Sequence, residues 1–190
     1  MHSNKGRIRI IGGEYRGRRI SVPDRPSLRP TPDRVRETLF NWLGQSLQGL
    51  ACLDLFAGSG ALGFEAASRG AARVVLVEHD RLAFQALKRT LDLLKSPQVE
   101  LVCGDAFAYL GRSREAFDVV FLDPPFGQNV LPAVLRHLKT KRGMRVYLES
   151  SEPVAPAAPW RELKRQRAGQ VSYQLFEWRG HDQGGLPGNV

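Results

Sequence analysis

The sequence predicts a doubly wound, Rossmann-like α/β fold, and three observations support this prediction. Five short apolar runs follow one another between residues 50 and 150, and segments with helical spacing separate them. Almost every residue in these runs is apolar, which is typical of strands buried on both faces in a parallel sheet. A glycine-rich turn directly follows the first run, where folds of this class make their first strand-to-helix connection.

The first 30 residues are expected to form a basic β-hairpin and a linker ahead of the main domain. Isoleucine and arginine alternate in RIRIIGGEYRGRRISVP, which gives a pair of strands one apolar and one basic face. The proline-rich stretch VPDRPSLRPTP then leads to a helix with Thr31 as its N-cap and Pro32 in its first turn. This helix carries apolar residues at spacings of three and four, namely Val35, Leu39, Trp42, Leu43 and Leu47.

The main domain is expected to span residues 31–179, with a disordered tail over residues 180–190. Its strands are the apolar runs LACLDLF, RVVLVE, VELVCGD, FDVVFLD and MRVYLES. After the proline-rich connection EPVAPAAP, the segment WRELKRQRAGQVSYQLFEW predicts two antiparallel strands around Ala168 and Gly169. The complete prediction is a seven-stranded, mostly parallel sheet with a C-terminal antiparallel hairpin and an added N-terminal β-hairpin.

Positive charge is concentrated at the N-terminus. The formal net charge is +9, and residues 1–36 contribute +7 of it through ten basic and three acidic side chains. Most of the basic ones are arginines, whose planar guanidinium groups bind phosphate oxygens and stack on bases. This pattern favours a nucleic acid as partner over a basic segment that is merely solvated.

Other features of the composition narrow the setting. No apolar run approaches the ~20 residues that a membrane helix requires, and the N-terminus does not resemble a secretory signal. Cys52 and Cys103 stand singly in apolar runs, without the spacing of a zinc site or a redox pair, and are expected to be buried thiols. We therefore expect a cytoplasmic, monomeric protein with no metal and no membrane association.

A glycine-rich loop follows the first of these strands, in the order Asp54-Leu-Phe-Ala-Gly58-Ser-Gly60-Ala-Leu-Gly63. It matches the G-x-G-x-x-G spacing, in which glycines let the backbone approach a nucleotide closely. Glu78 ends the next strand, where a carboxylate can accept both hydroxyl hydrogens of a ribose. These features fit S-adenosylmethionine and a nicotinamide dinucleotide alike.

Two acidic residues favour S-adenosylmethionine. Asp54 places a negative charge beside the loop, which would repel a pyrophosphate but attract the amino and sulfonium groups of S-adenosylmethionine. Asp105, in the turn after the third strand, can accept a hydrogen bond from an adenine amino group while the Ala106 N–H binds a ring nitrogen. An open alternative is that Asp105 simply caps the helix that begins at Ala106. The residues expected to hold the cofactor are Asp54, Phe56, Gly58, Ser59, Gly60, Glu78, His79, Asp105 and Ala106.

The fourth strand ends in Asp123-Pro124-Pro125-Phe126, the most specific of these features. Two prolines hold the backbone extended and leave the Pro124 carbonyl as an acceptor. An exocyclic base amine is a weak nucleophile because its lone pair is delocalised into the ring. Asp123 and this carbonyl can hold both amino hydrogens, and Phe126 can stack on the base. The motif therefore favours in-line methyl transfer to a base amine over a plain proline turn, with proton loss after the transfer.

These residues resemble one family over nearly the whole chain: the bacterial 16S ribosomal RNA guanine-N(2)-methyltransferases of the RsmD type, which have a Rossmann-like class I methyltransferase fold. The segments RIIGGEYRGRRI and RPTPDRVRETLFNWL carry the more specific part of the resemblance. The segments LDLFAGSGALGFEAASRGA, VEHD, GDA, VFLDPPF and GQVSYQLFEW follow in the same order as in that family.

The resemblance implies methylation of the 2-amino group of one guanine in 16S ribosomal RNA, on an assembled or assembling small subunit. The choice of guanine rests on the resemblance alone. It also implies that Asp123 to Phe126 form the catalytic loop and that the acids and glycines named above hold the cofactor. The residues expected to contact the RNA are Arg7, Arg9, Arg16, Arg18, Arg19, Thr31 and Arg34, the last two at the border of the active site.

Three alternatives remain open at this stage. The same Asp-Pro-Pro-aromatic loop serves adenine methylation in DNA, although such enzymes usually carry an added target-recognition region. A glutamine-methylating enzyme uses a similar loop on a protein substrate. Neither of these predicts the arginine-rich N-terminal hairpin. A non-catalytic RNA-binding assembly factor would show erosion of the loop or of the cofactor acids, and both are intact here.

Overall fold

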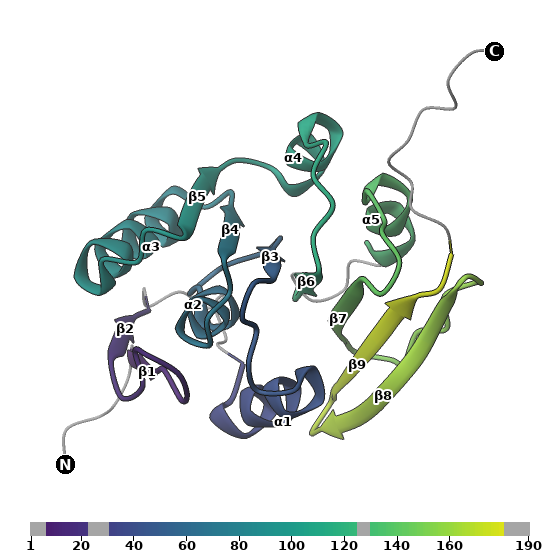
Figure 1. Ribbon diagram of the computed structural model, residues 1–190, viewed down its shortest axis with the longest axis horizontal. Helices are drawn as coiled ribbons and strands as arrows, with labels where there is room; N and C mark the ends of the chain where they lie inside the picture. The colour runs from purple at the N-terminus through teal and green to yellow at the C-terminus, as the bar shows by residue number, and fades with distance from the viewer. Residues whose placement is uncertain (1–6, 23–30, 125–129, 181–190) are drawn as a thin grey trace.

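Figure 1 shows a central sheet with helices on both faces and a small β-hairpin beside it. The structure, a computed structural model, describes residues 7–22, 31–124 and 130–180. Within these ranges, seven strands form one sheet in the order β5-β4-β3-β6-β7-β9-β8, and β1 pairs separately with β2. Strands β5, β4, β3, β6 and β7 are parallel, whereas β9 runs antiparallel to both β7 and β8. The predicted fold is confirmed, including both hairpins.

The elements alternate along the chain as the apolar runs predict. The strands are β1 (Arg7–Arg9), β2 (Arg19–Ser21), β3 (Ala51–Asp54), β4 (Arg73–Glu78), β5 (Val99–Cys103), β6 (Val119–Leu122), β7 (Arg145–Ser150), β8 (Trp160–Ala168) and β9 (Val171–Trp178). The helices are α1 (Asp33–Leu43), α2 (Ala61–Ser68), α3 (Arg81–Leu94), α4 (Ala106–Arg112) and α5 (Leu131–His137). In the described parts of the chain, no helix has the length and apolarity that crossing a membrane requires.

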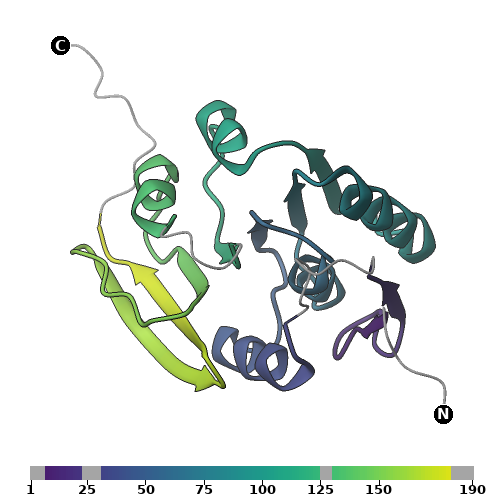
Figure 2. The ribbon, with the colours of Figure 1, turned by 180° about the vertical axis from the view of Figure 1, so that it is seen from behind.

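Two apolar layers cover the two faces of the sheet. The first packs α1, α2, α3 and the β1–β2 hairpin on one face, with Leu39, Phe64 and Ile20 among its buried residues. The second packs α4 and α5 on the other face, with Leu110 and Val134. Figure 2, seen from behind, likewise shows α4 and α5 grouped apart from α1 and α2.

The strand order places the site at one edge of the sheet. The chain builds outward from β3 to β4 and β5 on one side, and from β6 to β7 on the other. The carboxyl ends of these parallel strands meet at the same edge, and the order reverses between β3 and β6. Ligands of doubly wound folds bind outside the carboxyl ends, at such a reversal.

The N-terminal hairpin has the two faces that its alternating sequence predicts. Ile8 of β1 lies opposite Ile20 of β2 in an antiparallel pair, and both side chains are buried against the domain. Their neighbours along the strands, including Arg7 and Arg19, are exposed. Burial of the isoleucines therefore turns the arginines outward.

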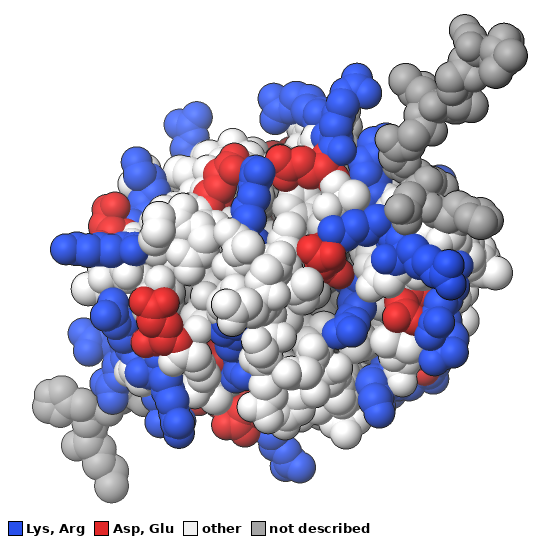
Figure 3. Space-filling model, in the orientation of Figure 1, with Lys and Arg blue, Asp and Glu red and all other residues white. Residues whose placement is uncertain are grey.

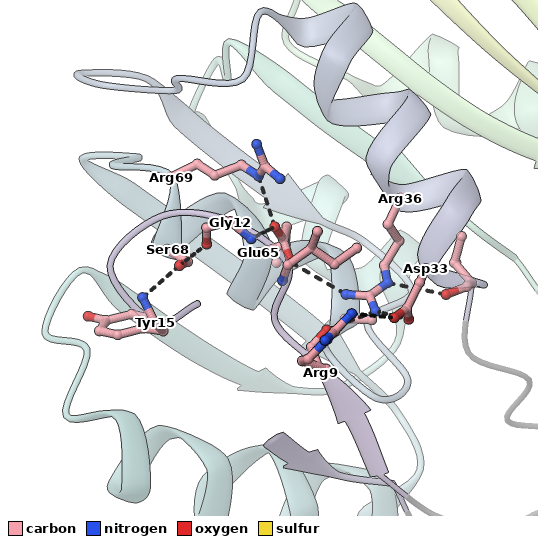
Figure 4. Close-up of polar contacts among 12 residues, drawn as sticks. Arg9, Gly12, Tyr15, Asp33, Arg36, Glu65, Ser68 and Arg69 are labelled. Atoms are coloured by element: carbon pink, nitrogen blue, oxygen red, sulfur yellow. Dashed lines mark hydrogen bonds and ion pairs between the residues drawn. The ribbon is translucent and has the colours of Figure 1, made fainter. Parts of the chain in front are cut away.

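One buried carboxylate, that of Glu65 on α2, fastens the hairpin to the domain. Its oxygens accept hydrogen bonds from the backbone N–H groups of Ile11 and Gly12, each at 2.8 Å. It also pairs with Arg36 of α1 at 3.4 Å and with Arg69, just beyond α2, at 2.9 Å. Figure 4 shows these groups converging on Glu65. The hairpin, α1 and α2 are thus joined at a single charged group.

Arg36 extends this connection toward the start of α1. Its side chain is fully buried, so its positive charge depends on the partners around it. One guanidinium nitrogen donates to Asp33 at 2.6 Å and to the Arg9 carbonyl at 2.9 Å. The Nε atom donates to the carbonyl of Thr31 at 3.3 Å. Arg36 therefore holds residue 31 in place from inside the protein.

Three sequence-based predictions are wrong in detail. The first helix was expected to include Leu47, but α1 ends at Leu43, where Gly44 caps it in the left-handed conformation. Pro32 occupies the N-cap of α1, and no side chain caps this helix. Thr31 instead directs its hydroxyl to Glu149 on β7, at 2.9 Å, a contact between distant parts of the chain. Cys103 is exposed, because it ends β5 at the edge of the sheet, whereas Cys52 is buried as expected. Most of the predicted linker and of the predicted tail lies outside the described residues.

Removing the Glu65 carboxylate should destabilise the protein strongly. We expect Glu65→Ala to lower the free energy of unfolding by about 3–5 kcal/mol, because it leaves the buried Arg36 charge without its buried partner. Urea denaturation followed by circular dichroism measures this change. Glu37→Ala, on the exposed face of α1, is the control and should change stability by less than about 0.5 kcal/mol. Equal, small effects of the two substitutions would contradict the role given to Glu65.

Candidate active site

Three acidic residues lie on one face of the sheet at its carboxyl edge: Asp54 in β3, Asp123 directly after β6, and Glu149 in β7. Side chains alternate between the two faces along a strand, so each acid shares its face with the residue two positions earlier. Those earlier residues include Phe121 and Tyr147, which belong to the apolar layer beneath α1 and α2. The three carboxylates therefore gather on the side of the sheet that these helices cover.

The glycine loop packs so closely that side chains would not fit. Gly60 has φ +77°, and a Cβ atom there would lie 2.6 Å from side-chain atoms of Leu87 and Phe64. A Cβ atom at Gly63 would lie 2.8 Å from Leu76 Cγ, at the contact between α2 and β4. Gly60 therefore has a left-handed backbone that a side chain would strain, and Gly63, the third glycine of the motif, lets the helix approach the sheet closely.

Asp54, at the end of β3, stabilises this loop through a hydrogen bond to the backbone. It is almost fully buried, and its Oδ2 accepts a hydrogen bond from the Gly63 N–H at 2.9 Å. The pKa of Asp54 is raised to about 7, chiefly by burial; the Gly63 hydrogen bond opposes this shift, and the nearby Glu78 charge adds to it. A positive ligand beside the loop would favour the ionised form of this carboxylate.

Glu78, at the end of β4, holds the other side of the loop. One of its oxygens accepts the Gly58 N–H at 2.7 Å, and the other accepts the Asp80 N–H at the same distance. His79 is exposed, with Nδ1 3.3 Å from Glu78. Because a carboxylate offers about four lone-pair sites, Glu78 keeps acceptor capacity for further donors.

The remaining expected cofactor residues occupy varied positions. Asp105 is exposed and caps α4, accepting the Ala108 N–H at 2.9 Å, so the capping interpretation describes its contact in the structure. Ala106 begins that helix and is buried. Phe56 is partly buried against the layer beneath α4 and α5, and Ser59 is buried in the loop. Ligand contacts of these residues stay predictions.

Asp123 and Pro124 are partly buried at the switch point, directly after β6. The pKa of Asp123 lies well above its ordinary range, first because of burial, then because of the negative charges of Glu149 and Asp54. Pro125 and Phe126, the other members of the predicted catalytic loop, lie outside the described residues. The charges of Glu149 and Asp54 thus act on Asp123, whose catalytic role stays a prediction.

Glu149 is a member of this cluster that the sequence analysis missed. Its Oε1 accepts hydrogen bonds from the hydroxyls of Thr31 and Tyr147, each at 2.9 Å. Burial raises the pKa of Glu149, while the two hydroxyls lower it. An acidic residue near the end of the fifth apolar run, MRVYLES, was the available signal, because the carboxyl ends of neighbouring parallel strands share an edge.

The basic residues expected to contact RNA are exposed. Arg7, Arg9, Arg16, Arg18 and Arg19 all project from the hairpin, and Arg34 projects from α1. Figure 3 shows Lys and Arg side chains gathered over the hairpin, toward the lower left. A second basic group, which the sequence analysis did not single out, lies on β8 at the opposite end of the sheet. Its exposed members are Arg161, Lys164, Arg165 and Arg167.

A groove of about 740 Å³ lies away from these acids, at the amino-end edge of the sheet. The hairpin turn and the C-terminal ends of α1 and α2 line it, and its charged residues carry both signs: Glu14, Arg16, Glu37 and Arg69. It contains none of the expected catalytic or cofactor residues. The carboxyl edge, which has the glycine loop and the clustered acids, is therefore the candidate active site.

Comparison with known proteins gives a consistent result. The family model described as conserved hypothetical protein 95 matches residues 8–177. The chain is 44% identical over 183 residues to ribosomal RNA small subunit methyltransferase D of Escherichia coli strain K12. The aligned region covers 93% of this chain and 92% of that protein. For the protein of the same name from Haemophilus influenzae, the identity is 42%, covering 91% of this chain and 95% of that protein.

Solved structures agree with these relatives. A structure described as a putative methyltransferase, yhhF, from Escherichia coli has a TM-score of 0.82 and 41% identity, and covers 92% of this chain and 99% of that chain. A putative methylase from Haemophilus influenzae, HI0767, has a TM-score of 0.77 and 37% identity, and covers 92% of this chain and 100% of that one. The chain belongs to the conserved hypothetical protein 95 family, the RsmD family of methyltransferases.

Proposed function

We propose that this protein transfers a methyl group from S-adenosylmethionine to the 2-amino group of a guanine in 16S ribosomal RNA, on an assembled or assembling small subunit. One observation carries the proposal: Asp123 directly follows β6, beside the glycine loop, in a chain 44% identical to a protein named ribosomal RNA small subunit methyltransferase D. Such a substrate places the protein in the cytoplasm. The expectations of a monomer without a metal stay predictions.

The proposed cofactor site combines the glycine loop with the acids around it. Gly58 and Gly60, which both have positive φ, are proposed to let the backbone approach the ligand, and Glu78 to accept hydrogen bonds from the ribose hydroxyls. The negative charge of Asp54 attracts the amino and sulfonium groups of S-adenosylmethionine. The same charge would repel a pyrophosphate. Bound S-adenosylmethionine supplies an activated methyl group. The residues around it fix its position and its charge environment.

The proposed chemistry at the base amine relies on acceptors beside the donor. Asp123 and the Pro124 carbonyl accept the two amino hydrogens, which makes the nitrogen more tetrahedral and its lone pair more available. Bound S-adenosylmethionine would supply the methyl group, and Asp123 and the Pro124 carbonyl would hold the amine nitrogen in line for its transfer. The methylated nitrogen then loses one proton, and Asp123 is the acceptor placed to receive it.

The hairpin supports RNA as the substrate. Five exposed arginines project from an element whose apolar side is buried, so the domain presents them at a fixed position. Guanidinium groups bind phosphate oxygens in a bidentate geometry, independently of base sequence. The hairpin is therefore proposed to position the RNA, and the carboxyl edge to act on the base.

Product analysis tests the proposal directly. The protein is incubated with labelled S-adenosylmethionine and either 16S RNA or small subunits that lack the modification. The RNA is then digested to nucleosides and the methylated position is mapped. Label in N(2)-methylguanosine is the expected result. Label in a methyladenosine, or no label with either substrate, would contradict the proposed function.

Replacing Asp123 should separate catalysis from cofactor binding. We expect Asp123→Ala to lower the rate of methyl transfer at least about a hundredfold, because the amine loses its principal acceptor. Its affinity for S-adenosylmethionine, measured by calorimetry, should stay within about threefold of the unsubstituted protein. Asp92→Ala, exposed on α3, is the control and should leave both quantities unchanged. A large loss of cofactor affinity in Asp123→Ala would show that the loop has a different role.

Cofactor affinity should increase with pH near neutrality. The pKa of Asp54 is raised to about 7, so this carboxyl is mainly protonated at pH 5.5 and mainly ionised at pH 7.5. The ionised form attracts the positive ligand, and the dissociation constant should therefore fall across this interval. Titrations of Asp54→Asn should give weaker binding at pH 7.5 and a flatter pH profile. A profile with the same slope in both proteins would exclude Asp54 as its cause.

The salt dependence of RNA binding tests the hairpin. We expect the joint replacement of Arg7, Arg9, Arg16 and Arg18 by glutamine to weaken binding. The slope of log affinity against log salt should become shallower by about 0.7–0.9 for each phosphate that the hairpin no longer neutralises. The control is the same change at Arg161, Lys164, Arg165 and Arg167, which removes equal charge from β8. An unchanged slope in the hairpin variant would remove the hairpin from the interface.

A further inference from the structure

We propose that Glu149 selects guanine by accepting the hydrogen bond of the base N1–H, beside the 2-amino group that Asp123 holds. This inference rests on the proposed function and adds a specificity-determining residue to it. Its support is the position of Glu149, the contacts that orient its carboxylate, and the pattern of donors on the guanine edge.

The pairing of β6 with β7 places Glu149 beside Asp123. Leu122 lies opposite Leu148 in this parallel pair, so Asp123 and Glu149 are the next residues along the two neighbouring strands. Neighbouring strands lie about 4.8 Å apart, and the two side chains share one face of the sheet. Two acceptor groups therefore stand next to each other at the edge where the base is proposed to bind.

Two hydroxyl groups from different parts of the chain orient the carboxylate of Glu149. Thr31, ahead of α1, and Tyr147, in β7, both donate to Oε1 of Glu149 at 2.9 Å. Thr31 is itself held by the buried Arg36, which donates to its carbonyl. In the described part of the chain, Oε2 makes no hydrogen bond, and the Glu149 residue is partly exposed. One oxygen is thus fixed and the other is available as an acceptor. Thr31 and Tyr147 are positioning residues.

The two neighbouring carboxylates of Asp123 and Glu149 favour a base edge that carries two hydrogen-bond donors and disfavour an edge that carries an acceptor. Two neighbouring carboxylates in a partly buried setting repel each other. Burial is the main reason that the pKa of Asp123 is raised, and the negative charge of Glu149 raises it further. N–H groups inserted beside both oxygens relieve this repulsion. The Watson–Crick edge of guanine presents N1–H and the 2-amino group side by side. Adenine presents an unprotonated N1, whose lone pair would face the carboxylate.

Base analogues at the mapped target position distinguish the contribution of N1–H from those of the 2-amino group and the atom at position 6. 2,6-Diaminopurine keeps the 2-amino group but has an unprotonated N1. 6-Thioguanine keeps both N1–H and the 2-amino group and changes only the atom at position 6. Small subunits are reconstituted with 16S RNA carrying guanine or either analogue at the target. Single-turnover methyl transfer is then measured with the full-length protein at saturating S-adenosylmethionine.

The unsubstituted protein should methylate 6-thioguanine within about threefold of the guanine rate and 2,6-diaminopurine at least about tenfold more slowly. Glu149→Gln should slow transfer to guanine and bring the two rates for guanine and 2,6-diaminopurine within about threefold, because an amide can also donate to N1. Tyr147→Phe, which removes one hydroxyl, should give a smaller loss of discrimination. Glu152→Gln, exposed just beyond β7, is the control and should keep the original ratio.

Several results would overturn the inference. Equal rates of the unsubstituted protein on guanine and 2,6-diaminopurine would show that N1–H is not read. An unchanged ratio in a folded Glu149→Gln protein would assign the discrimination to another residue. If that variant does not fold, Tyr147→Phe decides in its place, because it removes a hydroxyl that orients Glu149; an unchanged ratio in that variant would contradict the inference. Absence of N(2)-methylguanosine from the guanine substrate would instead refute the proposed function itself.

Discussion

The buried carboxylate of Glu65 is the interaction on which the arrangement of the N-terminal half depends. It satisfies backbone donors of the hairpin, a guanidinium from α1 and a guanidinium just beyond α2. Each of these groups would be costly to bury alone, and Asp33, which pairs with Arg36, supplies the second negative charge that balances the two guanidinium groups. The hairpin is therefore held as a rigid part of the fold, although β1 and β2 contain only three residues each.

The same connection reaches the candidate active site. Arg36 pairs with Glu65 and also donates a hydrogen bond to the carbonyl of Thr31. The Thr31 hydroxyl in turn donates to Glu149, which lies beside Asp123. The link consists of buried or partly buried polar contacts, each of which requires a specific geometry. An element proposed to bind RNA and the edge proposed to act on the base are thus parts of one hydrogen-bonded framework.

The sequence predicts the elements that depend on local pattern and fails where distant residues decide. Alternation and apolar runs predicted the strands and both hairpins. The glycine spacing predicted a loop between β3 and α2 that approaches a ligand; the structure has the loop at this position, and the ligand contact stays a prediction. The Thr31 cap was wrong because its hydroxyl finds a partner 118 positions away, which no local signal records. For the same reason, Arg36 is one of the ten basic side chains of residues 1–36 that favoured a nucleic-acid partner, but the structure buries it against Glu65. Glu149 was missed because its importance comes from its strand neighbour, not from a motif.

The three acids at the carboxyl edge also have a thermodynamic consequence. Burial raises the pKa values of Asp54, Asp123 and Glu149, and neighbouring negative charges add to the shift at Asp54 and Asp123, so keeping these groups ionised in the folded protein without a ligand costs free energy. A cationic donor and a base edge rich in N–H groups would reduce that cost on binding. The site without its ligand therefore lowers the stability of the folded protein. Occupancy and conformational stability are coupled in this way, and a weakly folded variant would be rescued by its own ligand.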